Sequence, residues 1–186
     1  MSFLTFPQWT VLGLLSAVLV AAVPLWGDLR PLSPLRLRSR AGLVLVLFSA
    51  ALAVAAAVAV GARPATGGAR SAVAALTVAT ALVGGGPIAS SVLRLADHGR
   101  HTGQPGPADP NVLHGGAWMG ALERLAVSAS LLAGWPEGIA VVLAVKGLGR
   151  YPELRVAAAA ERFIIGTFAS VLWAAACAGV GIALLH

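Results

Sequence analysis

Six charged side chains in the C-terminal half of the chain have the types and spacing to recognise an anion. They form three pairs on three consecutive segments that are otherwise largely apolar: Glu123, Arg124, Lys146, Arg150, Glu161 and Arg162. A charge at the centre of a membrane helix costs about 2.5–3.5 kcal/mol on insertion scales, so such groups are normally paired or hydrated. We therefore expect these side chains to share one network, as candidates for binding a substrate or a lipid.

The alternation of acids and bases predicts particular ion pairs within this network. We expect Glu123 to pair with Lys146, and Glu161 with Arg150. The guanidinium groups of Arg124 and Arg162 then remain for phosphate or other anionic groups, including lipid head groups, because guanidinium matches these with two parallel hydrogen bonds. The alternative is a structural or topological role, in which such pairs hold a bundle together and long side chains extend to the membrane surface.

Catalytic chemistry has weaker support, and we assign no catalytic residue. Hydroxyl nucleophiles near the charges need a base, and Glu123 and Glu161 are the candidates. The set of hydroxyls is Ser128, Ser130, Thr167 and Ser170. No nucleotide-binding loop, nucleophile elbow, zinc-protease helix or haem motif occurs in the sequence.

A metal site is also not expected. Histidine and aspartate side chains gather in one segment among glycines and prolines, at Asp97, His98, His101, Asp109 and His114. Their spacing matches no zinc motif. We predict neither a metal nor an organic cofactor.

The charged segments resemble a known pattern. It reads GGAWMGALER at 115–124, KGLGRYPE at 146–153 and ERFIIGTFAS at 161–170. The order and spacing resemble an uncharacterised family of small bacterial multi-pass membrane proteins, in the domain-of-unknown-function class. That family's pattern has an aromatic residue directly after the last glutamate, whereas this chain has Arg162 before Phe163. The resemblance covers about the last 75 residues and not residues 1–90, and it implies no particular activity.

Composition predicts that membrane helices position these charges. The chain has 186 residues, 58% of them hydrophobic, with 13 basic and 7 acidic side chains. Four stretches carry no charged residue, at 1–27, 41–62, 71–93 and 163–186. A membrane-spanning helix needs about 20 apolar residues. We therefore predict an integral membrane protein with the lipid bilayer as its surroundings, and we exclude nucleic acid as the reason for the basic excess. A lone cysteine, Cys177, excludes a disulfide framework.

The predicted fold is an all-α polytopic transmembrane bundle of about five to six segments in a single domain, 1–186. Apolar spans at 8–27, 41–62 and 71–93 occupy residues 1–93, a polar loop covers 94–113, and residues 114–186 form the charged half. We expect a helix that begins at Asn111, near the end of the loop, and runs to Trp135. A segment at 138–150 and a last span at 161–185 follow it. The segment 138–150 is short for a crossing, so it spans thinly or is re-entrant.

A run of helix breakers is expected to interrupt the third span, at Gly84, Gly85, Gly86 and Pro87. Proline cannot donate a hydrogen bond to the carbonyl of Val83. Unwound helices in transporters present backbone groups to substrates. A packing kink is the alternative, and the commoner one.

Small residues four apart predict close contacts between helices. Gly116 and Gly120 form one such pair, and Gly166 and Ser170 form another. Faces of this kind allow two helix backbones to approach closely in a membrane.

The basic residues predict orientation. Ten of the 13 lie in 28–40, 94–113 and 146–162, whereas Arg63 and Arg70 lie on the other side of the predicted bundle. Cytoplasmic loops carry the excess of Lys and Arg. The basic loops 28–40 and 94–113 are therefore predicted to be cytoplasmic, with both termini outside if 138–150 crosses. Twelve Arg to one Lys, with abundant Ala, is typical of a GC-rich bacterial genome, and we expect the membrane to be the bacterial plasma (inner) membrane.

Three classes of function fit these features. The first is a non-enzymatic membrane module or assembly subunit, working as a homo-oligomer or with a membrane-protein partner. The second is a transporter or channel-like protein for an anionic or lipid-phosphate substrate. The third is an intramembrane transferase or hydrolase with a glutamate as general base, and it lacks an identifiable nucleophile or metal.

Overall fold

The computed structural model describes residues 5–27, 34–96 and 116–186. Within these ranges the regular structure is entirely helical. The helices are α1 (Phe6–Gly27), α2 (Pro34–Val60), α3 (Gly68–Ala96), α4 (Gly116–Leu132), α5 (Gly138–Gly149) and α6 (Ala157–Leu185), with a short 3-10 helix, η2 (Glu153–Arg155), before α6. The predicted all-helical class is confirmed for the described part of the chain.

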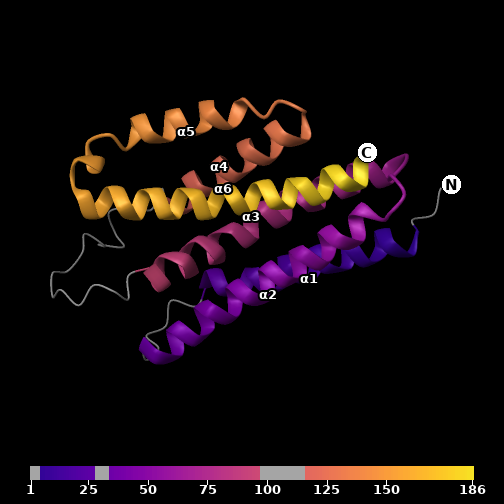
Figure 1. Ribbon diagram of the computed structural model, residues 1–186, viewed down its shortest axis with the longest axis horizontal. Helices are drawn as coiled ribbons and strands as arrows, with labels where there is room; N and C mark the ends of the chain where they lie inside the picture. The colour runs from indigo at the N-terminus through magenta and orange to yellow at the C-terminus, as the bar shows by residue number, and fades with distance from the viewer. Residues whose placement is uncertain (1–4, 28–33, 97–115) are drawn as a thin grey trace.

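Helices α3 and α6 form the centre of the bundle (Figure 1), with α1 and α2 on one side and α4 and α5 on the other. The central pair is antiparallel, because Gly181 lies against Thr77 and Gly166 lies against Leu93. A Cβ atom at Gly181 would come within 2.8 Å of Thr77 Oγ1, so the Thr77 side chain packs directly against the backbone of α6 there. Gly166 faces the Leu93 side chain of α3 and Ser170 is buried, so both small residues lie on the inner side of α6, while a close approach of two backbones there stays a prediction.

Four helices are long and apolar enough to cross a membrane. These candidate spans are Phe6–Val23, Arg40–Val60, Gly68–Ala96 and Ala157–Leu185, and each of them overlaps one of the four charge-free stretches. Large apolar side chains also cover their outer surfaces, among them Val20, Val46, Phe168 and Leu172. A helix that is apolar all round is typical of a membrane span. Helices α4 and α5 are shorter, at 17 and 12 residues.

The prediction that Gly84–Pro87 interrupts the third span is wrong. Helix α3 runs unbroken from Gly68 to Ala96 through all four residues. Neighbouring helices stabilise it there, since Trp173 of α6 packs against Gly84 and Arg124 of α4 packs against Gly85. Glycine and proline are tolerated inside membrane helices when adjacent helices satisfy the backbone groups they disturb.

Other boundaries shift by less. Helix α2 begins at Pro34, within the segment expected to be a linker, because proline is well suited to the first position of a helix. The fourth helix begins at Gly116 rather than Asn111, which lies outside the described residues. The last helix begins at Ala157, four residues before its predicted start at Glu161.

The helices alternate in direction. The C-terminal ends of α1, α3 and α5 and the first turns of α2, α4 and α6 lie at one end of the bundle (Figure 1). At the other end, Gln8 donates to the carbonyl of Arg63, and Arg70 donates to the carbonyl of Leu185 at 3.0 Å. A cation at a helix C-terminus is favourable because it meets the negative end of the helix dipole. Because α5 runs opposite to α4, the chain comes back to the first end of the bundle, and α6 starts at the same end as α2 and α4.

Trp173 anchors the centre and supports a first prediction. Its Nε1 donates to the carbonyl of Thr80 at 3.3 Å, and its ring lies 6.0 Å from that of Phe48. We expect Trp173→Phe to lower the free energy of unfolding in detergent by about 1–2 kcal/mol, because a buried hydrogen bond and part of the ring contact are lost. Thermal unfolding measures this. Trp118→Phe is the control, since Trp118 is 74% exposed, and equal effects of the two substitutions would contradict the prediction.

Candidate functional site

The charged half is built on a hairpin of α4 and α5. A turn at 133–137 joins the two helices, with Gly134 at φ +72° and the Trp135 amide donating to the carbonyl of Ser130 at 2.8 Å. A Cβ at Gly138 would lie 2.5 Å from Ser130 Oγ. The left-handed backbone and the close approach both favour glycine, so the sequence of the turn fixes how the two helices meet.

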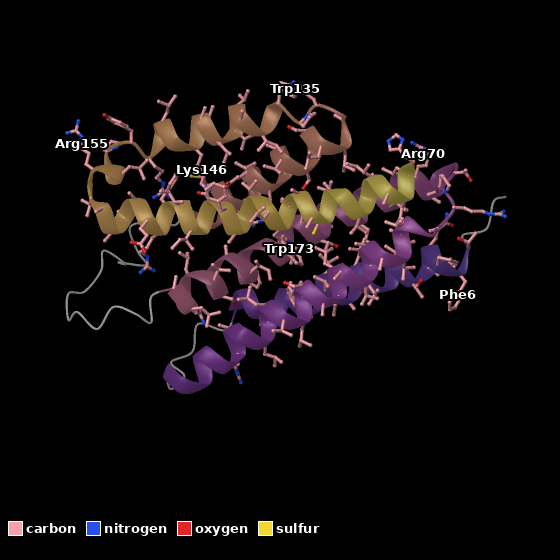
Figure 2. The ribbon with its side chains drawn as sticks, in the orientation of Figure 1. Phe6, Arg70, Trp135, Lys146, Arg155 and Trp173 are labelled. Carbon is pink, nitrogen blue, oxygen red and sulfur yellow. The ribbon has the colours of Figure 1, made fainter. Side chains whose placement is uncertain are left out.

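Glu123 and Lys146 form an ion pair inside this hairpin, as the sequence predicted. The Nζ of Lys146 donates to Oε2 of Glu123, which joins α5 to α4. The side chain of Lys146 is 17% exposed and that of Glu123 is 3% exposed. Lys146 Nζ also lies 5.4 Å from the centre of the Phe163 ring on α6, a cation–π contact. Figure 2 shows Lys146 directed from α5 toward α4 and α6.

Arg124 has a different environment from its neighbour in sequence. Its side chain is buried against α3, where Nε donates to the carbonyl of Leu82 at 3.0 Å. A Cβ at Gly85 would lie 2.2 Å from Arg124 Cδ, and one at Gly120 would lie 3.1 Å from Nη1. Two glycines on two helices therefore make room for this one side chain.

This arrangement corrects the role predicted for Gly120. We expected Gly116 and Gly120 to bring two helix backbones together, but the absent side chain of Gly120 instead accommodates the guanidinium group of its own helix. The contact between Arg124 and α3 was not predicted from the sequence. The glycine run at 84–86 was the available signal, because it marks a place where something approaches the helix closely.

The remaining predicted site residues lie toward one end of the bundle. Arg150 is half-buried directly after α5, while Glu161 and Arg162 are exposed near the start of α6. Each has an interaction partner. The pairing of Glu161 with Arg150 stays a prediction. The six charges thus divide into a buried group, Glu123, Arg124 and Lys146, and a group at the end of the bundle.

Several buried polar atoms around the buried group have no hydrogen-bond partner among the described residues. They are Glu123 Oε1, Arg124 Nη2, Ser128 Oγ, Thr167 Oγ1 and Ser170 Oγ. None of these three hydroxyls therefore donates to Glu123 in this geometry, as an activated nucleophile would.

The histidine-rich segment lies outside the described residues. Its members, from Asp97 to His114, fall in 97–115. In the part of the chain that the structure describes, no three His, Cys, Asp or Glu side chains come together in a way that could hold a metal ion.

No protein-family model matches the chain, and no curated protein or solved structure is significantly similar to it. The fold and the site together define a helical bundle. Four of its helices are suited to membrane insertion, and a charged hairpin packs through α4 on the central helices α3 and α6. The resemblance to an uncharacterised bacterial membrane family depends on the motifs at 115–124, 146–153 and 161–170 alone.

Proposed function

We propose that the protein is a non-enzymatic membrane module that works as a subunit or scaffold of a membrane assembly. One observation supports this most directly: the buried cations are engaged inside the chain. Lys146 is paired with Glu123, and Arg124 donates to the backbone of α3. The ion pair joins α5 to α4, and the hydrogen bond from Arg124 attaches the hairpin to α3.

The proposed setting is the plasma (inner) membrane of a bacterium, with the loops 28–40 and 94–113 in the cytoplasm. Basic side chains support this orientation, since Arg94 lies in the last turn of α3 and Arg150 directly follows α5, and both helices finish at the same end of the bundle. Positively charged loops remain preferentially on the cytoplasmic side. Anionic head groups on that side would contact these arginines.

Extraction into native lipid discs, followed by a mass measurement of the extracted particles, tests whether the protein is part of a membrane assembly. We expect a homo-oligomer or a defined complex with another membrane protein. Glu123→Gln should reduce the yield of that complex several-fold, because the hairpin loses its ion pair. Glu137→Gln is the matched control, since Glu137 is exposed in the turn before α5.

The runner-up is a transporter or channel-like protein for an anionic or lipid-phosphate substrate. The observation that favours it is the buried Nη2 of Arg124, which has no hydrogen-bond partner among the described residues. A monodisperse monomer whose anion flux in liposomes is abolished by Glu123→Gln and Lys146→Met would contradict the module and support this alternative.

A further inference from the structure

The charged residues that flank the helices define two different apolar lengths. The charge-free stretches 41–62, 71–93 and 163–186 are about 33–36 Å long as helices, at about 1.5 Å a residue. The hydrocarbon core of a bilayer is about 30 Å thick, so these stretches can cross it. Helix α5 has 12 residues, between Glu137 and Arg150, and is about 18 Å long. The α5 side of the bundle is therefore much shorter than a normal bilayer is thick.

The outer face of α5 is apolar along the helix. The exposed side chains of Val141, Val145 and Leu148 are spaced by four and three residues, so they form one stripe. The charge within this helix does not interrupt the stripe, because Lys146 is paired with Glu123 inside the hairpin. The stripe is thus suited to apolar surroundings.

The turn that precedes α5 shows how far water must reach. Every residue of this turn, from Ala133 to Glu137, is exposed. Figure 1 shows that the turn stops short of the end of the bundle at which α6 finishes. Irregular backbone does not face lipid in the hydrocarbon region, because its polar groups would lack hydrogen-bond partners, and the carboxylate of Glu137 adds a further cost. Water and head groups must therefore extend to the turn.

Aromatic side chains at the two ends of the stripe indicate that lipid covers it. Trp135 precedes α5 and Tyr151 follows it, and both are more than half exposed. Tryptophan and tyrosine are enriched where membrane helices meet the head groups. The guanidinium group of Arg155 lies 5.7 Å from the centre of the Tyr151 ring, so a cation is present at the same level. Rings at both ends of one apolar stripe are typical of a segment that faces lipid.

We propose that the α5 face contacts a bilayer that is locally thinned to about 20 Å of hydrocarbon. Thinning of the bilayer is one way in which a short apolar segment is accommodated. Helix α2, on the opposite side of the bundle, has the length of a normal bilayer, so the membrane thickness changes around the protein. Local thinning also lowers the cost of a charge in the membrane, which suits the ion pair of Glu123 and Lys146. This inference rests on the membrane insertion in the proposed function and not on the assembly.

Electron paramagnetic resonance of nitroxide labels tests the depth of α5, in liposomes of dioleoyl phosphatidylcholine and phosphatidylglycerol. Single labels are attached to Ala144→Cys on α5 and to the matched control Ala50→Cys on α2, in a Cys177→Ala background. Both alanines are exposed and lie near the middle of their apolar segments. Ala144 should lie about 9 Å from the nearer head groups, and Ala50 about 15 Å. We therefore expect a water-soluble nickel chelate to collide several-fold more often with the label at position 144.

Equal nickel accessibility at positions 144 and 50 would overturn the proposal, because both faces would then meet a bilayer of one thickness. A label at Glu137→Cys should be accessible to the chelate at head-group level. Shielding of this label from both nickel and oxygen would also overturn the proposal, since protein would then cover the turn. Failed membrane insertion has a different signature, free access of nickel to the label at Ala50→Cys, and it would reject both proposals. A monomeric particle in lipid discs would reject the assembly and leave these depths unchanged.

Discussion

Glu123→Leu is expected to lower the free energy of unfolding by about 3 kcal/mol, because it leaves the ammonium group of Lys146 without its carboxylate inside the bundle. The estimate is at the low end for a broken buried pair, since Lys146 is 17% exposed and its side chain is long enough to move toward water. Unfolding in detergent, followed by loss of helical circular dichroism, measures the change.

A second substitution separates the ion pair from the space that Glu123 fills. Glu123→Leu combined with Lys146→Met removes both charges, and we expect this double variant to recover most of the lost stability. The double-mutant cycle then gives the coupling between the two side chains. Additive losses would show that the pair contributes little. Glu137→Leu is the matched control, because Glu137 is exposed in the turn, and its effect should remain within about 0.5 kcal/mol.

This pair shows what sequence reasoning can predict in such a protein. The cost of inserting a charge requires a counter-charge, and Lys146 is one of few candidates on the neighbouring segment, so side-chain types alone predicted the partner. The long helices were predictable for a related reason. Charge-free runs of membrane length leave few alternatives to a spanning helix, and each of the four long candidate spans overlaps one such run.

Arg124 shows where that reasoning fails. Its partner is the backbone carbonyl of Leu82, and a carbonyl is present at every position, so no residue type marks it. The glycines at 84–86 were expected to break α3 because their local preferences oppose a helix. Tertiary contacts outweigh those preferences, since Trp173 and Arg124 occupy the space that side chains on Gly84 and Gly85 would need. Local rules identified an unusual place in the sequence and assigned it the wrong structure.

Gly85→Ala should have the second large effect, because the added methyl group would lie 2.2 Å from Arg124 Cδ and 2.7 Å from Nε. Arg124 must then leave α3 and lose its hydrogen bond to Leu82, at a combined cost of about 3 kcal/mol. Alanine favours a helix over glycine by about 1 kcal/mol, so the expected net loss of stability is about 2 kcal/mol. Thermal unfolding in detergent checks this value.

The matched control for Gly85 is Gly179→Ala on α6. A Cβ at Gly179 meets nothing within 4 Å, so this substitution should be neutral or stabilise by up to about 1 kcal/mol. Truncation of the Arg124 side chain, which the added methyl group would contact, provides the decisive comparison. In an Arg124→Ala background, Gly85→Ala should lose most of its effect, because the two nearest of the three closest atoms are removed and Trp173 Cδ1 at 3.1 Å remains. If Gly85→Ala is equally destabilising with and without the arginine side chain, then Gly85 does not serve to accommodate Arg124. Recovery in the double variant would establish that Gly85 in α3 accommodates the buried cation of Arg124 from α4.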